Sequence, residues 1–156
     1  MATGIAGGPA AVVEDLLLVE YFHFALQCYP SGTVALDLGI PDGRVLGGPG
    51  GATLRSGTTD HYAPIRLELW PAEPAPDATR AWDEVESAAF SVDAVELRLT
   101  AVTAGIGDGA LLLAATGGYR IRAHVAQTAP FPEVPQEEFG RDLERWVLQV
   151  WPDGPA

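Results

Sequence analysis

The chain has 156 residues, and its charge limits the partners it can bind: 21 acidic side chains against 9 basic ones give a formal net charge of −12. Such a surface repels phosphate backbones and anionic lipid headgroups, so neither nucleic acid nor a membrane is an expected partner, whereas basic proteins are attracted. All nine basic residues are arginine, which excludes lysine Schiff bases and P-loop lysines. The alternative explanation is that excess acid only keeps a small protein soluble and monomeric.

The length and the cysteine content indicate a single domain that folds without covalent cross-links. A chain of this size buries roughly 68–70% of its unfolded surface, and 47% of the residues are hydrophobic. Cys28 is the only cysteine, so neither an internal disulfide nor a Cys-x-x-Cys pair can form. Residues 1–15 carry no basic leader, and the apolar run at 16–19 is too short for a membrane span or a signal sequence. We therefore expect a cytoplasmic protein that is a monomer or a weak homodimer.

Alternating apolar residues and frequent Gly and Pro predict an all-β protein. Residues 1–12, rich in Ala and Gly, are expected to form a flexible arm, and residues 13–156 one domain. Segment 82–91 fits either a short helix or an irregular strand. The pattern predicts an antiparallel β-sandwich with jelly-roll or Greek-key connections and at most one or two short helices. The predicted strands are 16–27, 33–38, 64–70, 95–103, 111–114, 117–125 and 145–151, with short edge strands around Val45 and at 53–54.

A short repeat links two of the predicted strands. Residues 67–71 read Leu-Glu-Leu-Trp-Pro, and residues 148–152 read Leu-Gln-Val-Trp-Pro. Because proline cannot donate to a sheet ladder, a strand that ends in Trp-Pro is expected at an edge. The repeat therefore predicts two edge strands that end alike, with coincidence in a proline-rich chain as the alternative.

Residue types that carry chemistry are present without the spacing that chemistry needs. The glycine-rich stretch 39–60 lacks the strand, helix and lysine of a phosphate loop, and 105–109 lacks the carboxylates of a calcium loop. No Gly-x-Ser-x-Gly motif occurs, and His23, His61 and His124 are far apart in the sequence. We expect no enzymatic activity, no metal and no cofactor, with a metal-dependent enzyme built from converging histidines as a minor alternative.

One predicted strand carries a basic stripe. Arg120, Arg122 and His124 fall on one side of it, opposite the apolar side. Arginines two residues apart project side by side, which suits an anion site or a partner surface. The alternative is cross-strand pairing with outward acids such as Glu68 or Glu96, worth a fraction of a kcal/mol to about 1 kcal/mol per pair.

Several motifs resemble those of known proteins. They are 118–123 (Gly-Tyr-Arg-Ile-Arg-Ala), 140–142 (Gly-Arg-Asp), Glu144 with 147–152 (Val-Leu-Gln-Val-Trp-Pro), and the aromatic opening strand 19–24. This set is similar to the C-terminal half of small actinobacterial proteins and to β-sandwiches of the competence protein J type, which are nuclease inhibitors. The chain departs from that pattern by its glycine-rich loop and by the Pro- and Glu-rich segment before Gly140. The resemblance implies a protein-binding inhibitor without catalysis.

An acidic connector is the main candidate for partner binding. Residues 130–144 are rich in proline and acid, and an interface for a basic protein needs aromatic anchors inside an acidic rim. The sequence thus predicts a non-enzymatic acidic module that binds a basic partner such as a nuclease. A small-ligand or carbohydrate-binding jelly roll, with Tyr and Trp stacking in a concave sheet, is the alternative. The candidate partner-binding residues are Trp70, Trp82, Glu133, Glu137, Glu138, Asp142, Arg120 and Arg122.

Overall fold

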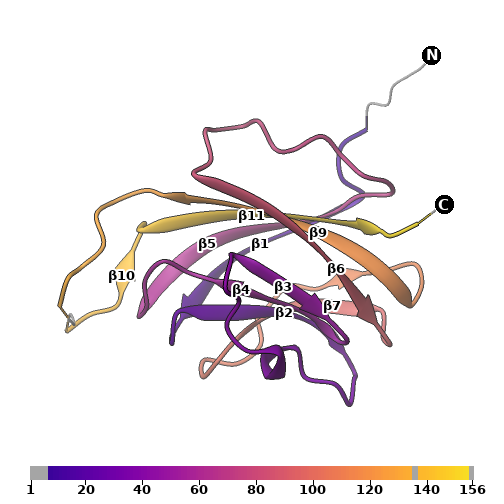
Figure 1. Cartoon of the computed structure of the whole chain (residues 1–156), viewed down its shortest axis with the longest axis horizontal. Coiled ribbons are helices and arrows are strands. Elements are labelled where there is room, and N and C mark those ends of the chain that lie inside the picture. The colour runs from indigo at the N-terminus through magenta and orange to yellow at the C-terminus, as the bar shows by residue number, and fades with distance from the viewer. Residues whose placement is uncertain (1–6, 135–136, 155–156) are drawn as a thin grey trace.

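Strands dominate the protein in a computed structural model that describes residues 7–134 and 137–154 (Figure 1). The 3-10 helix η1 (Ala35–Leu38) is the only helix in this part of the chain, and none there has the length and apolar character needed to cross a membrane. The strands are β1 (Ala11–Val19), β2 (His23–Tyr29), β3 (Val45–Gly48), β4 (Gly51–Arg55), β5 (His61–Leu69), β6 (Glu84–Val92), β7 (Glu96–Ala101), β8 (Leu111–Leu112), β9 (Gly117–Gln127), β10 (Gly140–Arg141) and β11 (Glu144–Pro152).

Two sheets face each other as a sandwich, which confirms the predicted all-β class. The first sheet has the order β1-β5-β11-β9-β6, with β10 added beside β5, and the second has the order β3-β4-β2-β7-β8. In Figure 1 the first sheet is the upper layer and the second the lower. Strand β5 runs parallel to β11 and to β10, whereas the other pairs are antiparallel. The first sheet is therefore mixed rather than purely antiparallel.

Inward side chains of both sheets form one core between the layers. Phe24 of the second sheet meets Trp146 of the first edge to face, with ring centroids 5.2 Å apart. Burying one such apolar side chain stabilises the fold by about 1.5–3 kcal/mol. The largest fully buried apolar side chains are Phe24, Leu26, Leu54, Ile65, Leu67, Leu97, Leu99, Leu111, Ile121, Trp146 and Leu148.

The predicted strand 16–27 is in fact two strands that belong to different sheets. Tyr21 and Phe22 have φ angles of 57° and 64°, and Glu20 and His23 form a bridge across this two-residue turn. Two consecutive left-handed residues are typical of a type I′ turn, which normally contains Asn and Gly. The aromatic residues that stand there instead continue the alternating pattern. The prediction of one long strand is wrong for this reason.

Other predicted elements differ in type or in their ends. Segment 33–38 ends in η1 instead of forming a strand. The sequence pattern did not indicate this helix, because four residues are too few to show a helical period. Of the ambiguous segment 82–91, residues 84–91 lie in a strand, β6, and residues 82 and 83 end the preceding connector. Strand β1 begins at Ala11, so the last two residues of the expected arm 1–12 lie in a strand. Residues 1–6 of that arm lie outside the described residues.

The two Trp-Pro strands are direct neighbours. Strands β5 and β11 pair in parallel inside the first sheet, so the prediction that both lie at edges is wrong. Each has its proline at or beyond the end of the ladder, where no hydrogen bond is lost. The paired residues are Leu67 with Leu148, Glu68 with Gln149 and Leu69 with Val150. Equivalent positions of the two repeats are therefore paired with each other across the two strands.

The connector over residues 70–83, which we call the strap, crosses the outer face of the first sheet (Figure 1). Its three prolines keep it out of the ladders. Its backbone oxygens accept hydrogen bonds from outward side chains of the sheet: Arg122 Nη1 donates to Pro74 O at 2.8 Å, and Gln149 Nε2 donates to Ala75 O at 3.0 Å. The strap therefore covers part of a sheet face that would otherwise be exposed.

Candidate protein-binding site

Two aromatic side chains point into solvent at the turn between β1 and β2. Tyr21 is 61% exposed and Phe22 is 47% exposed. Their left-handed backbone conformation costs of order 1–3 kcal/mol for each residue. His23 Nδ1 lies 2.6 Å from Tyr21 O and ties the turn to β2. Strained backbone together with exposed aromatic area is typical of a binding surface.

Phe22 also lines a groove at this end of the sandwich. The groove has a volume of about 300 Å³ and lies between the turn at 57–60 and the segment that follows β9. Gly57 has to be small, since a Cβ there would lie 2.8 Å from the ring of Phe131. Residues 135–136 of the segment lie outside the described residues. The groove is lined by Phe22, Gly57, Thr58, Thr59, Asp60, Phe131, Pro132, Glu133, Val134, Glu138 and Gly140.

Backbone and side-chain hydrogen bonds fix the segment on both sides of the groove. At its base the Thr128 N–H donates to Leu143 O at 2.9 Å, and Thr128 Oγ1 donates to Asp142 O at 2.6 Å. Nearer the groove the Gly140 N–H donates to Asp60 O at 2.9 Å, and β10 extends the first sheet along β5. The acidic connector predicted from the sequence is thus attached to the sandwich by strand pairing as well as by the chain.

An aromatic cluster adjoins this attachment. Phe139, which is 44% exposed, meets Tyr62 edge to face with ring centroids 6.0 Å apart. The guanidinium of Arg141 lies 4.5 Å from the centroid of the same Tyr62 ring, a cation–π contact. Phe139 is held in place by this packing while much of its ring stays accessible.

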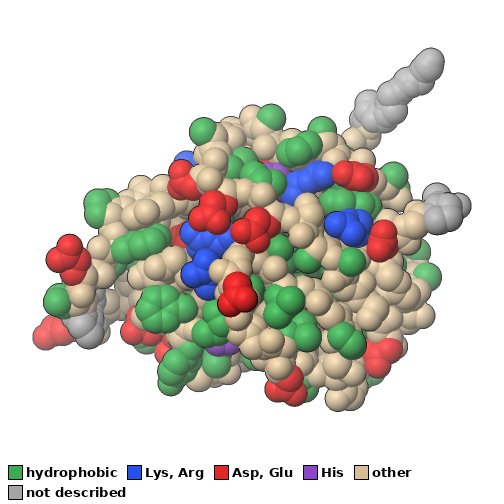
Figure 2. Space-filling view, viewed as in Figure 1, with side chains coloured by type: hydrophobic (Ala, Val, Ile, Leu, Met, Phe, Trp, Pro, Cys, Tyr) green, Lys and Arg blue, Asp and Glu red, His purple; other side chains and the backbone are tan. Residues whose placement is uncertain are grey.

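Acidic side chains border the aromatic residues. Glu133 and Glu138 line the groove, and Asp60 joins them from the turn before β5. Glu137 and Asp142 are exposed in the same segment. Figure 2 shows acidic and apolar side chains next to one another at the left end of the molecule, where β10 lies in Figure 1. We call the surface formed by Tyr21, Phe22, Asp60, Phe131, Glu133, Glu138 and Phe139 the acidic end.

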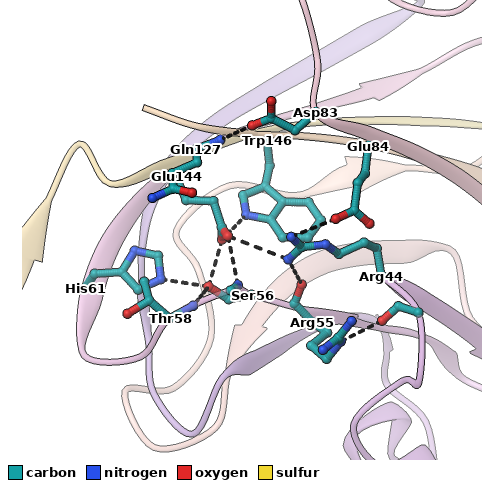
Figure 3. Close-up of polar contacts among 12 residues, drawn as sticks. Arg44, Arg55, Ser56, Thr58, His61, Asp83, Glu84, Gln127, Glu144 and Trp146 are labelled. Atoms are coloured by element: carbon teal, nitrogen blue, oxygen red, sulfur yellow. Dashed lines mark hydrogen bonds and ion pairs between the residues drawn. The ribbon is translucent and has the colours of Figure 1, made fainter. Parts of the chain in front are cut away.

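The buried carboxylate of Glu144 is the centre of a set of polar contacts (Figure 3), and it positions one wall of the groove. Glu144 Oε1 accepts hydrogen bonds from Ser56 Oγ at 2.7 Å and from Trp146 Nε1 at 2.8 Å. Its Oε2 accepts the Gly57 N–H at 2.9 Å and lies 3.7 Å from Arg44 Nη1. Because Ser56 and Gly57 lead into the turn that forms the wall, Glu144 sets the position of that turn.

Ser56, His61 and Glu144 are in contact, but in the wrong order for a serine nucleophile. Ser56 Oγ donates its one proton to Glu144, so in the 2.9 Å contact His61 Nε2 is the donor. A catalytic histidine has to accept the serine proton instead. Burial lowers the pKa of His61 below its ordinary value, which keeps the ring neutral. Ser56 is buried as well. This arrangement stabilises a turn and does not present a nucleophile.

Arg44 joins the two layers beside this cluster. Its Nη2 pairs with Glu84 Oε1 of β6 at 3.1 Å, and its Nη1 donates to Arg55 O of β4 at 2.9 Å. The edges of the two sheets approach closely here, since a Cβ at Gly47 of β3 would overlap the carbonyl oxygen of Ala89 of β6. The sandwich is therefore closed along this side.

The basic stripe of β9 lies largely beneath the strap. Arg122, 8% exposed, pairs with Glu73 at 2.8 Å and donates to Gln149 Oε1 at 3.0 Å. Its guanidinium also lies 4.9 Å from the centroid of the Trp151 ring. The acids considered from the sequence have other partners: Glu68 pairs with Arg66, and Glu96 pairs with Arg98. Arg122 therefore anchors the strap through Glu73.

The rest of the stripe divides between buried and accessible positions. His124 is fully buried, and its Nε2 accepts the Asp77 N–H at 2.9 Å. Burial lowers the pKa of His124, so the ring is neutral and can accept that bond. Arg120 is only half-buried and lines a small hollow with Glu73 and Trp151. Arg122 and His124 of the stripe thus contact the strap, and Arg120 is its accessible arginine.

Trp70 and Trp82 belong to the strap and are engaged by neighbouring residues. Trp70 Nε1 donates to Glu68 Oε1 at 2.9 Å. The Trp82 ring lies 5.5 Å from the ring of His124 and 5.6 Å from the guanidinium of Arg80. Trp82 lines a cavity on the outer face of the sheet, whereas Glu133 and Glu138 line the groove. The aromatic residues of the acidic end are therefore Tyr21, Phe22, Phe131 and Phe139, none of which belongs to the strap.

Sequence reasoning missed five residues of the acidic end. Phe131 and Phe139 stand in a Pro- and Glu-rich connector that has no strand pattern to bury them, which is a usable signal. Tyr21 and Phe22 gave no such signal, because they continue the alternation of the preceding strand. Asp60 is brought to the groove only by the pairing of β10 with β5.

Comparison with known proteins places this architecture among solved structures. No known protein family and no curated protein matches the sequence. ComJ from Bacillus subtilis, described as an inhibitor of the DNA degrading activity of NucA, aligns with a TM-score of 0.59 at 10% identity, over 93% of this chain and 97% of its own. The protein of crocagin biosynthetic gene J aligns with a TM-score of 0.59 at 12% identity, over 92% and 98%. The chain shares their fold, and at that level the resemblance to the competence protein J type is confirmed.

Proposed function

We propose that this chain is a non-enzymatic binding module that restrains a basic protein, and that a DNA-degrading enzyme is the class of partner. The observation that carries the proposal is the shared fold with ComJ over nearly the full length of both chains. ComJ is described as an inhibitor of a DNA degrading activity. The charge and the surface of this chain support the same class of function.

The charge of the chain supports a basic partner. A formal charge of −12 attracts cationic proteins over distances of about a Debye length and raises the rate of encounter. An enzyme that degrades DNA presents arginine and lysine to the phosphate backbone. An acidic inhibitor can occupy the same positive surface and so compete with the nucleic acid for it.

The acidic end supports a specific contact in addition to charge attraction. Phe22 and Phe139 supply accessible aromatic area, and Glu133 and Glu138 lie close enough to the groove to form a charged border. Binding energy in protein interfaces is concentrated in a few aromatic or arginine anchors surrounded by polar residues. A partner that places an apolar side chain in the groove and basic residues around it satisfies both parts of this surface.

The buried cluster supports the non-enzymatic part of the proposal. Ser56 gives its proton to Glu144 rather than to His61, and all three residues are buried. The proposed activity rests on binding alone.

Inhibition of DNA degradation tests the proposal. Basic proteins of the source organism, retained on a cation exchanger, are assayed for DNA degradation with and without the purified chain. We expect a dose-dependent loss of degradation at low salt and recovery at high salt, because salt screens exposed charges. Unchanged degradation at both salt concentrations would contradict the proposed function.

A pair of variants locates the contact. Phe22→Ser combined with Phe139→Ser removes the anchors without changing the charge, and we expect it to weaken inhibition roughly tenfold or more. Leu112→Ser is the matched control, since Leu112 is also exposed, on β8 of the other sheet. Equal inhibition by the two variants would place the contact away from the acidic end.

A further inference from the structure

A cavity lies on the outer face of the first sheet, under the edge of the strap. It has a volume of about 530 Å³, within the range of small-molecule sites. Strands β1, β5 and β11 form its floor, and strap residues 79–82 form a wall. It is lined by Glu14, Asp15, Pro64, Ile65, Arg66, Thr79, Arg80, Trp82, Arg145, Trp146 and Val147.

Arg145 stands on this floor without an acidic neighbour in the sheet. On β9 it faces Ala126, and the register in which Trp146 faces Ile65 places Pro64 beside it on β5. Neither neighbour is charged. The arginine is exposed and has no ion pair with any described residue. In a chain with more than two acids for each arginine, an arginine so placed is available to an external anion.

Arg80 reaches the same cavity from an ordered turn of the strap. The carboxylate of Asp77 accepts the Thr79 N–H at 3.1 Å, the Thr79 hydroxyl at 2.5 Å and Trp82 Nε1 at 3.1 Å. The two carboxylates closest to Arg80 in the sequence, Asp77 and Asp83, therefore both accept hydrogen bonds from neutral donors, which for Asp83 is the Gln127 N–H at 2.7 Å. The guanidinium of Arg80 lies over the Trp82 ring and makes no ion pair among the described residues.

Arg66 is the third arginine at the cavity, and it is already paired. Its Nη1 lies 2.8 Å from Glu14 Oε1, and its Nε lies 2.7 Å from Glu68 Oε2. The acids Glu14 and Asp15 also line the cavity, on the β1 side. Arg66 is shared by Glu14 and Glu68, which leaves one negative charge in this group, and Asp15 alternates with Glu14 along the strand, on the side that faces the core. The two unpaired arginines therefore define the positive side of the cavity.

We propose that this cavity binds a small phosphomonoester through Arg80 and Arg145. Arginine forms charge-assisted, often bidentate, hydrogen bonds with phosphate oxygens. Pro64 and Val147 also line the cavity and offer an apolar contact to the organic part of the ligand. This site is separate from the acidic end and does not depend on the proposed function.

Thermal unfolding in the presence of phosphate tests the site. A ligand that binds only the folded state raises the unfolding temperature, and the rise grows with the ratio of ligand concentration to dissociation constant. We expect sodium phosphate to raise the unfolding temperature of the wild-type chain above that in sodium chloride of equal ionic strength. Arg80→Gln and Arg145→Gln should each bind phosphate roughly tenfold more weakly, since each removes a charge-assisted contact. Arg120→Gln, another arginine on this face but outside the cavity, should keep the full effect.

The ligand class and the alternatives are separated in the same assay. Phenyl phosphate should bind more tightly than inorganic phosphate, because its ring can contact Pro64 and Val147. Equal binding of the two would overturn the organic phosphomonoester as the ligand. The absence of a phosphate effect in the wild-type chain, or an unchanged effect in Arg80→Gln or Arg145→Gln, would overturn the site.

Discussion

Glu144 is the residue on which the acidic end depends most. It is buried, and its two oxygens accept hydrogen bonds from Ser56, Gly57 and Trp146 while Arg44 lies nearby. A buried carboxylate is tolerated only when its acceptor capacity is used in this way. The residue therefore links the core, through Trp146, to the turn that forms the groove.

Glu144→Gln should destabilise the fold by about 2–4 kcal/mol, because the amide nitrogen places a donor against the donors that now point at the carboxylate. Urea unfolding measures the change. Glu138→Gln is the matched control: its side chain is exposed, and we expect a change within about 0.5 kcal/mol. Equal stability of the two variants would contradict the structural role given to Glu144.

Two buried histidines make the stability of the fold depend on pH. Burial lowers the folded-state pKa of His61 and of His124, whereas both titrate near about 6.5 in the unfolded chain. Between the folded pKa and about 6.5 the unfolded chain binds more protons, so the free energy of unfolding falls as the pH falls through this window. The loss should reach at most about 1.4 kcal/mol per pH unit for each histidine.

Urea unfolding at about pH 7.5 and about pH 5.5 tests this pH dependence. His61→Gln combined with His124→Gln should show a smaller difference between the two pH values. Imidazole resonances of the folded wild-type chain provide a second measurement, and both should titrate below about 6.5. Imidazole titration above that value would refute the assignment of these histidines as buried and neutral.

At the scale of elements, the strap determines which part of the basic stripe is available. Arg122 binds the strap through Glu73 and Pro74 O, whereas Arg120 on the same strand is half-buried and makes no ion pair among the described residues. Two arginines that look equivalent in the sequence therefore differ in role. The difference arises from a proline-rich connector that the sequence places on the surface without showing which face it covers.

Single substitutions of the two arginines should separate these roles. Arg122→Gln loses charge-assisted hydrogen bonds under the strap and should lower the free energy of unfolding by about 2 kcal/mol. Arg120→Gln should change it by less than about 0.5 kcal/mol. Urea unfolding of both variants under one condition measures the difference. Equal effects would mean that the strap is not held by Arg122.

Alternation in the sequence was sufficient to predict most elements but not the break between β1 and β2. Strands β5, β7, β9 and β11 show period-2 patterns, since one face of each packs into the core. The break at Tyr21 and Phe22 is decided by backbone conformation, and aromatic residues there conceal it. The parallel pairing of β5 with β11 was present in the sequence as a repeat, but the repeat alone does not distinguish neighbours from two similar edges.

At the scale of the whole molecule, the structure shows where part of the excess negative charge lies. The acids Glu133 and Glu138 could be selected from the sequence because they stand in a proline-rich connector. Their aromatic companions Tyr21 and Phe22 come from a distant turn, and only the closure of the sandwich brings the two segments together. Composition thus predicts the sign of the charge of the proposed partner, whereas the position of the proposed contact depends on tertiary structure.

Binding at the acidic end is tested most directly by an affinity measurement. The partner is the basic DNA-degrading protein that the chain inhibits, and two variants that lose the same charge are compared. Glu133→Gln/Glu137→Gln/Glu138→Gln removes acids at the groove and beside it. Asp37→Asn/Asp108→Asn/Asp153→Asn removes three exposed acids elsewhere. We predict roughly tenfold weaker binding at low salt for the first variant and less than about twofold for the second, with both differences shrinking at high salt. Equal weakening by the two variants, or none by the first, would contradict binding at the acidic end.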